Sequence, residues 1–257
     1  MLLPVVLRRE HVERFSPAGT GNNLLDALAP HEFSHILPHL ERIALPVRLF
    51  LHEPGKLIEF VYFPQHGMVS IVATLEDHVS VEIGVVGKEG FLGVPIMLEA
   101  DTSPHEVFVQ IAGSGLRMKA SAMRSATERS PTFRNLLFRY VQFYLLQVSQ
   151  TAACNVRHPL EGRLARWLLM AHDRLDGTHD AMPLTHEFLA MMLGVQRPGV
   201  SIAAGTLQNA GLISYTRGRV TVMNRDALED ASCECHRVVN DAYKRLFPAT
   251  DTAGRGH

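Results

Sequence analysis

The chain has 257 residues, of which 46% are hydrophobic and 20% charged, and its formal net charge is −1. This much apolar material can build a folded core, so a wholly disordered protein is excluded. The 19 glycines and 14 prolines follow no fixed period, which excludes a collagen-like chain. The near-neutral balance is also not that of a protein that coats nucleic acid by bulk charge, so any basic face must be local.

Cysteine content and hydropathy indicate where the protein works. The three cysteines are too few for a disulfide scaffold, and their odd number leaves a free thiol, so we expect a reducing compartment. The apolar run at the start precedes Arg8 and Arg9, the reverse of a secretory signal. No run of about 18 uncharged apolar residues is present to span a membrane. We therefore expect a cytoplasmic protein without a membrane partner.

The first half of the chain is predicted to be rich in short strands. Residues 1–21 are expected to form an arm, and Asn22 or Asn23 to cap a short helix over 24–28, before a second helix near 32–40. Between about 43 and 119, β-rich runs alternate with turns containing glycine, proline or acidic residues. The expected strands are 47–51, 57–63, 68–74, 79–86, 107–111 and 116–119. Many short strands at this spacing are typical of a sandwich or barrel.

The pattern then changes to a helical period. Apolar residues recur every three or four positions from 131 to 156, which predicts one long helix. A second apolar stripe contains Leu136, Phe143 and Leu146, more than a helix lying on one surface needs. Two interpretations are open: a helix between its own domain and a partner, or a helix buried inside one domain. Under the first, the dimer contact would comprise Phe133, Leu137, Tyr140, Val141, Tyr144 and Val148.

A helix-turn-helix is predicted after a further helix over 160–175. Thr185 is a suitable N-cap, Gly194 suits a left-handed helix end, and Arg197-Pro198 suits the start of a second helix. Two short helices joined by a turn of about three residues form this motif. Residues 212–223 then predict a hairpin with a basic tip, which is a wing.

This motif predicts contact with DNA. The start of a recognition helix reads base edges in the major groove, which places Gln196, Arg197, Gly199 and Ser201 at the bases, and an arginine can bond to both O6 and N7 of guanine. From 183 to 225 four arginines accompany one glutamate, a local charge of +3. Two alternatives are open: a helical hairpin with an incidental arginine, and a module whose winged helix contacts protein. The residues expected at phosphates are Thr185, His186, Arg217 and Arg219.

These segments resemble a known family. LARWLL, THEFLAMMLGVQRPGVSIAAGTLQNAGLI and YTRGRV resemble the DNA-binding domain of Crp/Fnr-superfamily regulators, and EFVYFPQHGMVSIV with VEIGVVGKEGFLGVP resembles their cyclic-nucleotide-binding-like β-roll. The resemblance covers about residues 22–230. Arg197 matches the family's guanine-reading arginine, while Pro198 stands where a glutamate often follows, which leaves the half-site sequence open.

The resemblance implies an α+β fold and a non-enzymatic function. It implies a transcription regulator that binds palindromic double-stranded DNA as a homodimer and contacts RNA polymerase. The expected domains are an N-terminal arm (1–21), a β jelly-roll sensor domain (22–130), a dimerisation helix (131–156), a winged helix-turn-helix domain (157–230), and a C-terminal helix and tail (231–257).

A glycine-rich turn is the candidate effector site. Gly87, Gly90, Phe91 and Gly93 form a turn whose backbone N–H groups suit an anion. Relatives that bind cyclic AMP carry a glutamate at the position of Phe91 and an arginine near 104–105, where this chain has neither. The resemblance therefore implies that cyclic AMP is not bound in the usual pose, and no effector is identified.

No metal, cofactor or enzymatic site is expected. The N-terminal region lacks the cysteine cluster of an iron–sulfur sensor, and Pro38 disrupts the helix that would align His31, His35 and His39. The pair Cys233 and Cys235 suits a soft metal or a regulatory thiol pair, but it lacks zinc-knuckle spacing, so ordinary helix residues are favoured. A cupin-type enzyme would need clustered ligands, and His66, His78, His105 and Glu82 contain no His-x-His pair.

Overall fold

The computed structural model describes residues 19–76, 79–175 and 181–248. Most of the expected arm, His78 and the turn expected at 176–178 therefore lie outside the described residues. Among the described helices, none is both long and apolar enough to cross a membrane.

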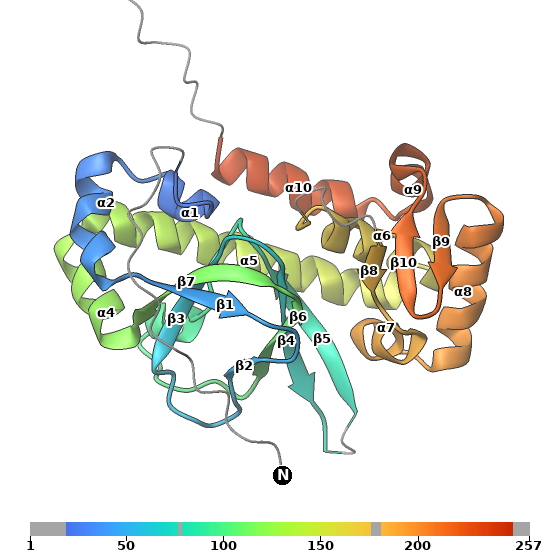
Figure 1. The fold of residues 1–257 in the computed structure, drawn as a ribbon, viewed down its shortest axis with the longest axis horizontal. Coiled ribbons are helices and arrows are strands. Elements are labelled where there is room, and N and C mark those ends of the chain that lie inside the picture. The colour runs from blue at the N-terminus through green and yellow to red at the C-terminus, as the bar shows by residue number, and fades with distance from the viewer. Residues whose placement is uncertain (1–18, 77–78, 176–180, 249–257) are drawn as a thin grey trace, which may run out of the picture.

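The N-terminal half is a β-roll made of two antiparallel sheets (Figure 1). One sheet has the order β1-β7-β3 and the other β2-β6-β4-β5. The strand β4 pairs with both β5 and β6, so it lies inside the second sheet. The strands are β1 (Glu41–Leu45), β2 (Phe50–His52), β3 (Phe60–Pro64), β4 (Met68–Thr74), β5 (Ser80–Val86), β6 (Glu106–Ile111) and β7 (Gly113–Lys119).

Short helices close the roll at its ends. Asn22 caps the first of them through its side-chain oxygen and donates from its amide to the carbonyls of Pro64 and Gly90, which ties the helix to two loops. Pro38 lies in a 3-10 turn, η1 (Leu37–His39), that ends the second helix. The helices are α1 (Asn23–Asp26), α2 (Pro30–Ile36), α3 (Val94–Met97) and α4 (Ala120–Arg129).

The long helix α5 (Pro131–Arg157) runs along the roll and leads to the helical domain (Figure 1). Phe63, Phe91 and Tyr140 form a chain of aromatic contacts that fixes the helix on the roll. Beyond it, α6 (Leu160–His172) begins after Pro159, and α10 (Cys235–Leu246) packs back along α5. The other elements are β8 (Ala181–Pro183), α7 (His186–Leu193), α8 (Arg197–Asn209), β9 (Ile213–Thr216), β10 (Arg219–Val222) and α9 (Arg225–Ala231).

Two hydrophobic cores hold the described chain together. The first lies between the sheets and α5. The second belongs to the helical domain but includes Met68, Val72, Val85 and Ile111 from the four-stranded sheet. The helical domain is therefore packed directly on that sheet, and apolar burial stabilises this arrangement.

Candidate nucleic-acid interface

Local signals build the helix-turn-helix as the sequence predicts. The hydroxyl of Thr185 accepts a hydrogen bond from the backbone N–H of Phe188 and caps α7, and Gly194 ends the helix with a φ of 62°. The second helix, α8, begins at Arg197 with proline in its first turn. Its inner face, comprising Val200, Ala203, Ala204 and Leu207, is buried.

Three of the four residues expected at DNA bases lie on the outer face of the start of α8, and Gly199 instead faces α6. Gln196, Arg197 and Ser201 are exposed, and Gly199 is half-buried beside Leu160. Ile202 is 68% exposed and continues the same face. This end of the helix therefore presents one guanidinium among small and apolar side chains, which permits close approach to base edges.

The guanidinium of Arg197 has an acidic neighbour in this domain. Its Nε lies 2.8 Å from Oε1 of Glu187, and both side chains are more than 60% exposed. An exposed pair of this kind contributes little to stability. Arg197 can therefore leave the carboxylate of Glu187 at small cost.

His186 corrects one expectation, because its ring faces the protein. It stacks on Tyr215 with ring centroids 4.1 Å apart, and its Nδ1 lies 2.9 Å from Oγ of Ser201. Burial and then the positive charge of Arg197 lower the pKa of His186. The ring of His186, itself on α7, therefore contacts both α8 and the wing.

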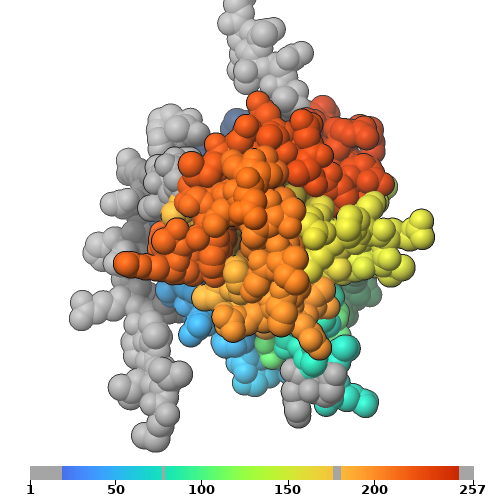
Figure 2. Space-filling model, turned by 90° about the vertical axis from the view of Figure 1, so that its right-hand side faces the viewer, coloured from blue at the N-terminus to red at the C-terminus, as the bar shows by residue number. Residues whose placement is uncertain are grey.

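The wing is a tight hairpin with two arginines at its tip. Arg217 and Gly218 both have positive φ, 50° and 73°, the geometry that a two-residue hairpin loop requires. Arg217 is exposed, whereas Arg219 donates to the carbonyl of Ala181 at 2.8 Å. Figure 2 looks onto this side of the molecule, where the helix-turn-helix and wing, in orange, form the centre of the face.

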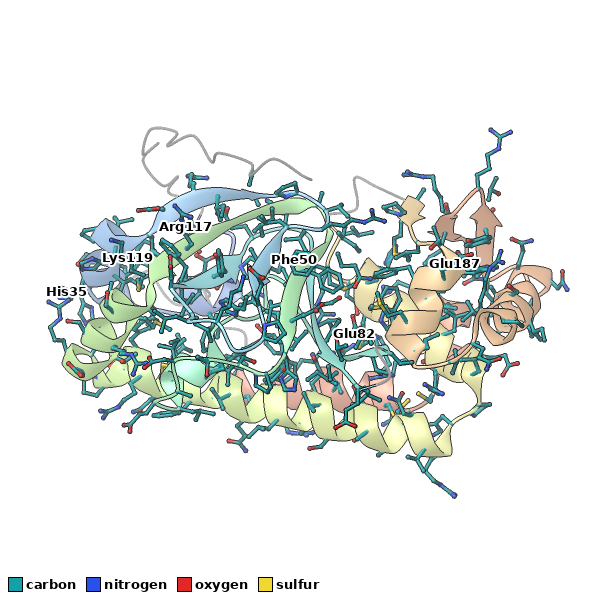
Figure 3. The ribbon with its side chains drawn as sticks, turned by 90° about the horizontal axis from the view of Figure 1, so that it is seen from below. His35, Phe50, Glu82, Arg117, Lys119 and Glu187 are labelled. Carbon is teal, nitrogen blue, oxygen red and sulfur yellow. The ribbon has the colours of Figure 1, made fainter. Side chains whose placement is uncertain are left out.

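A buried polar network, which sequence reasoning missed, joins this domain to the β-roll. Glu82 of β5 is 5% exposed and accepts hydrogen bonds from Ser70 and from Nε1 of Trp167, the latter at 2.7 Å. Figure 3 shows Glu82 at the boundary between the sheet and the helical domain. Burial raises the pKa of Glu82 to about 7, against the lowering effect of its hydrogen bonds. The sequence predicted a strand at this position, but nothing in the strand pattern indicated that Glu82 would be buried.

The predicted dimer contact on α5 needs correction. Phe133, Leu137, Tyr140 and Val141 are at most 6% exposed because they pack on the chain's own β-roll. Tyr144 also packs on this core, and Val148 is half-buried. The stripe with Leu136 and Phe143 is buried as well, where Phe143 meets Tyr243 of α10. Neither stripe is available to a partner in this arrangement.

A third face of α5 is exposed instead. We call it the α5 seam, and it recurs at steps of four and three residues. Its large apolar members are Phe138, Leu145 and Val156, which are 43%, 58% and 83% exposed. The whole α5 seam comprises Phe138, Gln142, Leu145, Ser149, Ala152 and Val156.

The candidate effector turn is filled by the protein itself. Phe91 is fully buried, and a Cβ on Gly90 would lie 2.2 Å from the ring of Tyr140. Gly93 has a φ of 116° and precedes α3. The turn therefore serves core packing and leaves no room for a ligand between Gly90 and Tyr140. Close by, a cleft of about 140 Å³ is lined by Lys88, Glu89 and Arg174 and by residues of α5 and α10.

The expectation about the cysteines also changes. Cys154 and His158 at the end of α5 meet Cys233 and Cys235 at the start of α10, with all four ligand atoms within 4.8 Å of one another. This group, which we call the thiol cluster, could hold a metal ion. In the sequence, only the Cys-x-Cys pair of Cys233 and Cys235 suggested a metal site, because Cys154 and His158 are distant from it in the chain.

Comparison with known proteins identifies the domain and the fold. Residues 162–231 match the family of the Crp-like helix-turn-helix domain. FixK2 from Bradyrhizobium japonicum has a similar structure, with a TM-score of 0.64 and 17% identity over 76% of this chain and 98% of that one.

Two further solved structures agree with this result. The c-di-GMP-responsive global regulator CLP from Xanthomonas campestris gives a TM-score of 0.61 and 19% identity, over 76% of this chain and 100% of that one. A CRP-family transcriptional regulator from Thermus thermophilus gives a TM-score of 0.60 and 21% identity, over 75% of this chain and 96% of that one. The search of curated proteins found no match. Residues 162–231 thus match a Crp-like helix-turn-helix domain, and the chain as a whole shares the fold of these solved structures.

Proposed function

We propose that this protein is a sequence-specific transcription regulator that binds a palindromic DNA site as a homodimer. The observation that carries the proposal is the exposed start of α8, where Arg197 stands beside a basic wing in a Crp-like helix-turn-helix domain. An α-helix fits the major groove, and phosphate contacts from flanking elements set its position.

The reading step would be an exchange of partners. In the free protein Arg197 pairs with Glu187, and on DNA two of its N–H groups would bond to O6 and N7 of a guanine, which contributes about 1–3 kcal/mol of discrimination. Gln196, Gly199 and Ser201 would contact neighbouring bases. Thr185 at the start of α7, Arg217 and Arg219 would lie near phosphates. Glu187 would then face a negatively charged backbone, so it limits affinity for every sequence.

The homodimer would form through the α5 seam. Alternating steps of four and three residues bring one side of a helix against its copy in a two-stranded coiled coil. Phe138, Leu145 and Val156 supply large apolar surface there, and Ser149 and Ala152 permit close approach. The dimer places two α8 helices on one duplex, and we expect them about 34 Å apart, one turn of B-DNA.

The decisive experiment is selection of binding sites from random duplex DNA with the full chain. We expect a palindrome that contains a guanine in each half-site. Arg197→Ala should lose the preference at that base, whereas the control Arg129→Ala, exposed on α4, should select the parent site. Recovery of the same palindrome by Arg197→Ala would show that another residue reads DNA, and selection of no site by the parent would show that the winged helix contacts protein instead.

Contact with RNA polymerase and a cytoplasmic location belong to the same proposal, because a transcription regulator of this type would meet DNA and RNA polymerase in the cytoplasm. The proposal names no small-molecule effector. The turn around Gly90 and Phe91 is closed by Tyr140, which supports the expectation that cyclic AMP does not bind there in the usual pose.

A further inference from the structure

The thiol cluster brings four soft ligand groups to one point. Sγ of Cys154 lies 3.4 Å from Sγ of Cys233, and Sγ of Cys235 lies 3.5 Å from Nδ1 of His158. In a tetrahedral zinc site with bonds of about 2.3 Å to sulfur and 2.0–2.1 Å to nitrogen, neighbouring ligand atoms are about 3.5–3.8 Å apart. The observed separations are of that size, so small side-chain movements suffice to surround one ion.

The histidine is already oriented as a metal ligand. Its Nε2 lies 3.1 Å from the carboxylate of Glu234, and donation of a proton to this carboxylate leaves the Nδ1 lone pair free toward the sulfurs. A carboxylate behind a ligating histidine fixes its tautomer and strengthens it as a ligand. The amide of Gln150 lies 3.1 Å from Sγ of Cys235 and can donate to a thiolate there.

Positive charge is available to balance such a centre. Three thiolates and one Zn²⁺ carry a net charge of −1 together. Arg163 and Arg166 are 9% and 4% exposed, and among the described residues neither Nε has a hydrogen-bond partner.

We propose that Cys154, His158, Cys233 and Cys235 bind one Zn²⁺ ion in a closed tetrahedral site. All three cysteines are at most 9% exposed, which suits a structural site without an open position. A disulfide between Cys154 and Cys233 is the competing interpretation. It would use two of the four groups and would not account for the orientation of Cys235 and of His158 with its carboxylate.

The position of the site suggests what the ion does. His158 and Pro159 separate α5 from α6, so the ligands lie at the junction between the long helix and the DNA-binding domain. Two ligands belong to α5 and its end, and two to the segment that starts α10. Zinc would therefore clamp the C-terminal helix onto α5 and hold the helical domain in place. This inference goes beyond the proposed DNA binding and does not depend on it.

The test uses the full chain, reduced, stripped of metal and titrated with Co²⁺, which reports its ligands by colour. We expect one equivalent per chain, with the strong visible bands of a tetrahedral site and sulfur-to-metal charge transfer. Zn²⁺ should displace the colour. At free Zn²⁺ about 100-fold above the Kd, the Tm should rise by roughly 5–10 °C.

Variants connect the signal to these residues. Cys235→Ser and His158→Gln should abolish or shift the bands, whereas the exposed control His31→Gln should match the parent. Glu234 is exposed and is not itself a proposed metal ligand. The variant Glu234→Gln should therefore fold normally and weaken metal binding about 10- to 100-fold. Circular dichroism and Trp167 fluorescence check that each variant is folded.

Three results would overturn the proposal. One is binding well below one equivalent in the reduced parent, and another is bands that persist unchanged in Cys235→Ser and His158→Gln. The third is a protein that carries a Cys154–Cys233 disulfide as isolated and binds no metal once this disulfide is reduced. That result would make the thiol cluster a redox site. An effect of Glu234→Gln no larger than that of His31→Gln would remove the assigned role of the carboxylate.

Discussion

Replacing Glu82 by glutamine should remove a pH-dependent loss of stability. Glu82 is 5% exposed between the four-stranded sheet and α6, and its neighbours include Ser70, Trp167 and the charges of Arg166 and Arg174. Burial is the largest influence and raises the pKa of this carboxyl from 4.5 to about 7. Glutamine keeps an oxygen for Trp167 and an N–H for Ser70 but never ionises.

The sign and the size follow from proton linkage. Between pH 4.5 and 7 the folded chain binds more protons at Glu82 than the unfolded chain, so stability falls as the pH rises. The contribution is complete below pH 4.5 and is lost as the pH rises through 7. At 1.36 kcal/mol per pKa unit, the full effect is about 3 kcal/mol. The advantage of Glu82→Gln over the parent should therefore grow by about 2–3 kcal/mol between pH 5 and pH 8.

Urea unfolding at pH 5, 6, 7 and 8 measures this difference. Trp167 is the chain's one tryptophan and contacts Glu82 directly, so its fluorescence reports on the interface itself. Other titrating groups, including the buried His52, contribute equally to both proteins and cancel in the difference. Glu128→Gln, exposed on α4, is the matched control. Parallel pH curves for Glu82→Gln and the parent would refute the reasoning.

Three further predictions concern the DNA-binding surface, the dimer and the core. Arg217→Ala should weaken binding to all duplexes and lower the slope of log K against log salt by about one unit per protomer; an unchanged slope would remove Arg217 from the phosphate contacts. Leu145→Asp should give a monomer by sedimentation. The control Leu98→Asp should stay dimeric, because Leu98 is 56% exposed, close to the 58% of Leu145, but lies outside the α5 seam. A dimeric Leu145→Asp protein would exclude the α5 seam as the dimer contact. Gly90→Ala should cost about 1–3 kcal/mol of unfolding free energy, because its Cβ would overlap the Tyr140 ring. Gly205→Ala, with open space around it, is its control, and equal stability of the two variants would contradict the proposed clash.

Much of the fold follows from signals within a few residues. Strand β4 and helix α5 match the predicted ranges closely, and the caps of α7 at Thr185 and Gly194 are as expected. The strand β1 and the helix α4 were not predicted. β1 buries only Ile43 and Leu45, and α4 buries mostly small residues and is polar along much of its length, so neither contains enough large apolar residues to stand out in the sequence.

The candidate DNA surface was also predictable, because it depends on local chemistry. A capped helix, a glycine turn, a proline start and a basic hairpin tip specify the motif wherever it packs. His186 is the exception, since its contacts with Tyr215 and Ser201 join three elements. Its orientation depends on how those elements meet.

The sequence by itself determined most of the order of the elements, the two ends of α7 and the position of Arg197 at the start of α8, because backbone preferences act over a few residues. Only the tertiary structure decided which face of α5 stays exposed, that Tyr140 closes the glycine turn, and that Glu82 is buried beside Trp167. It also brought Cys154 to Cys233, 79 residues later. Burial and contact depend on segments far apart in the chain, and a periodic apolar pattern does not say which neighbour will cover it.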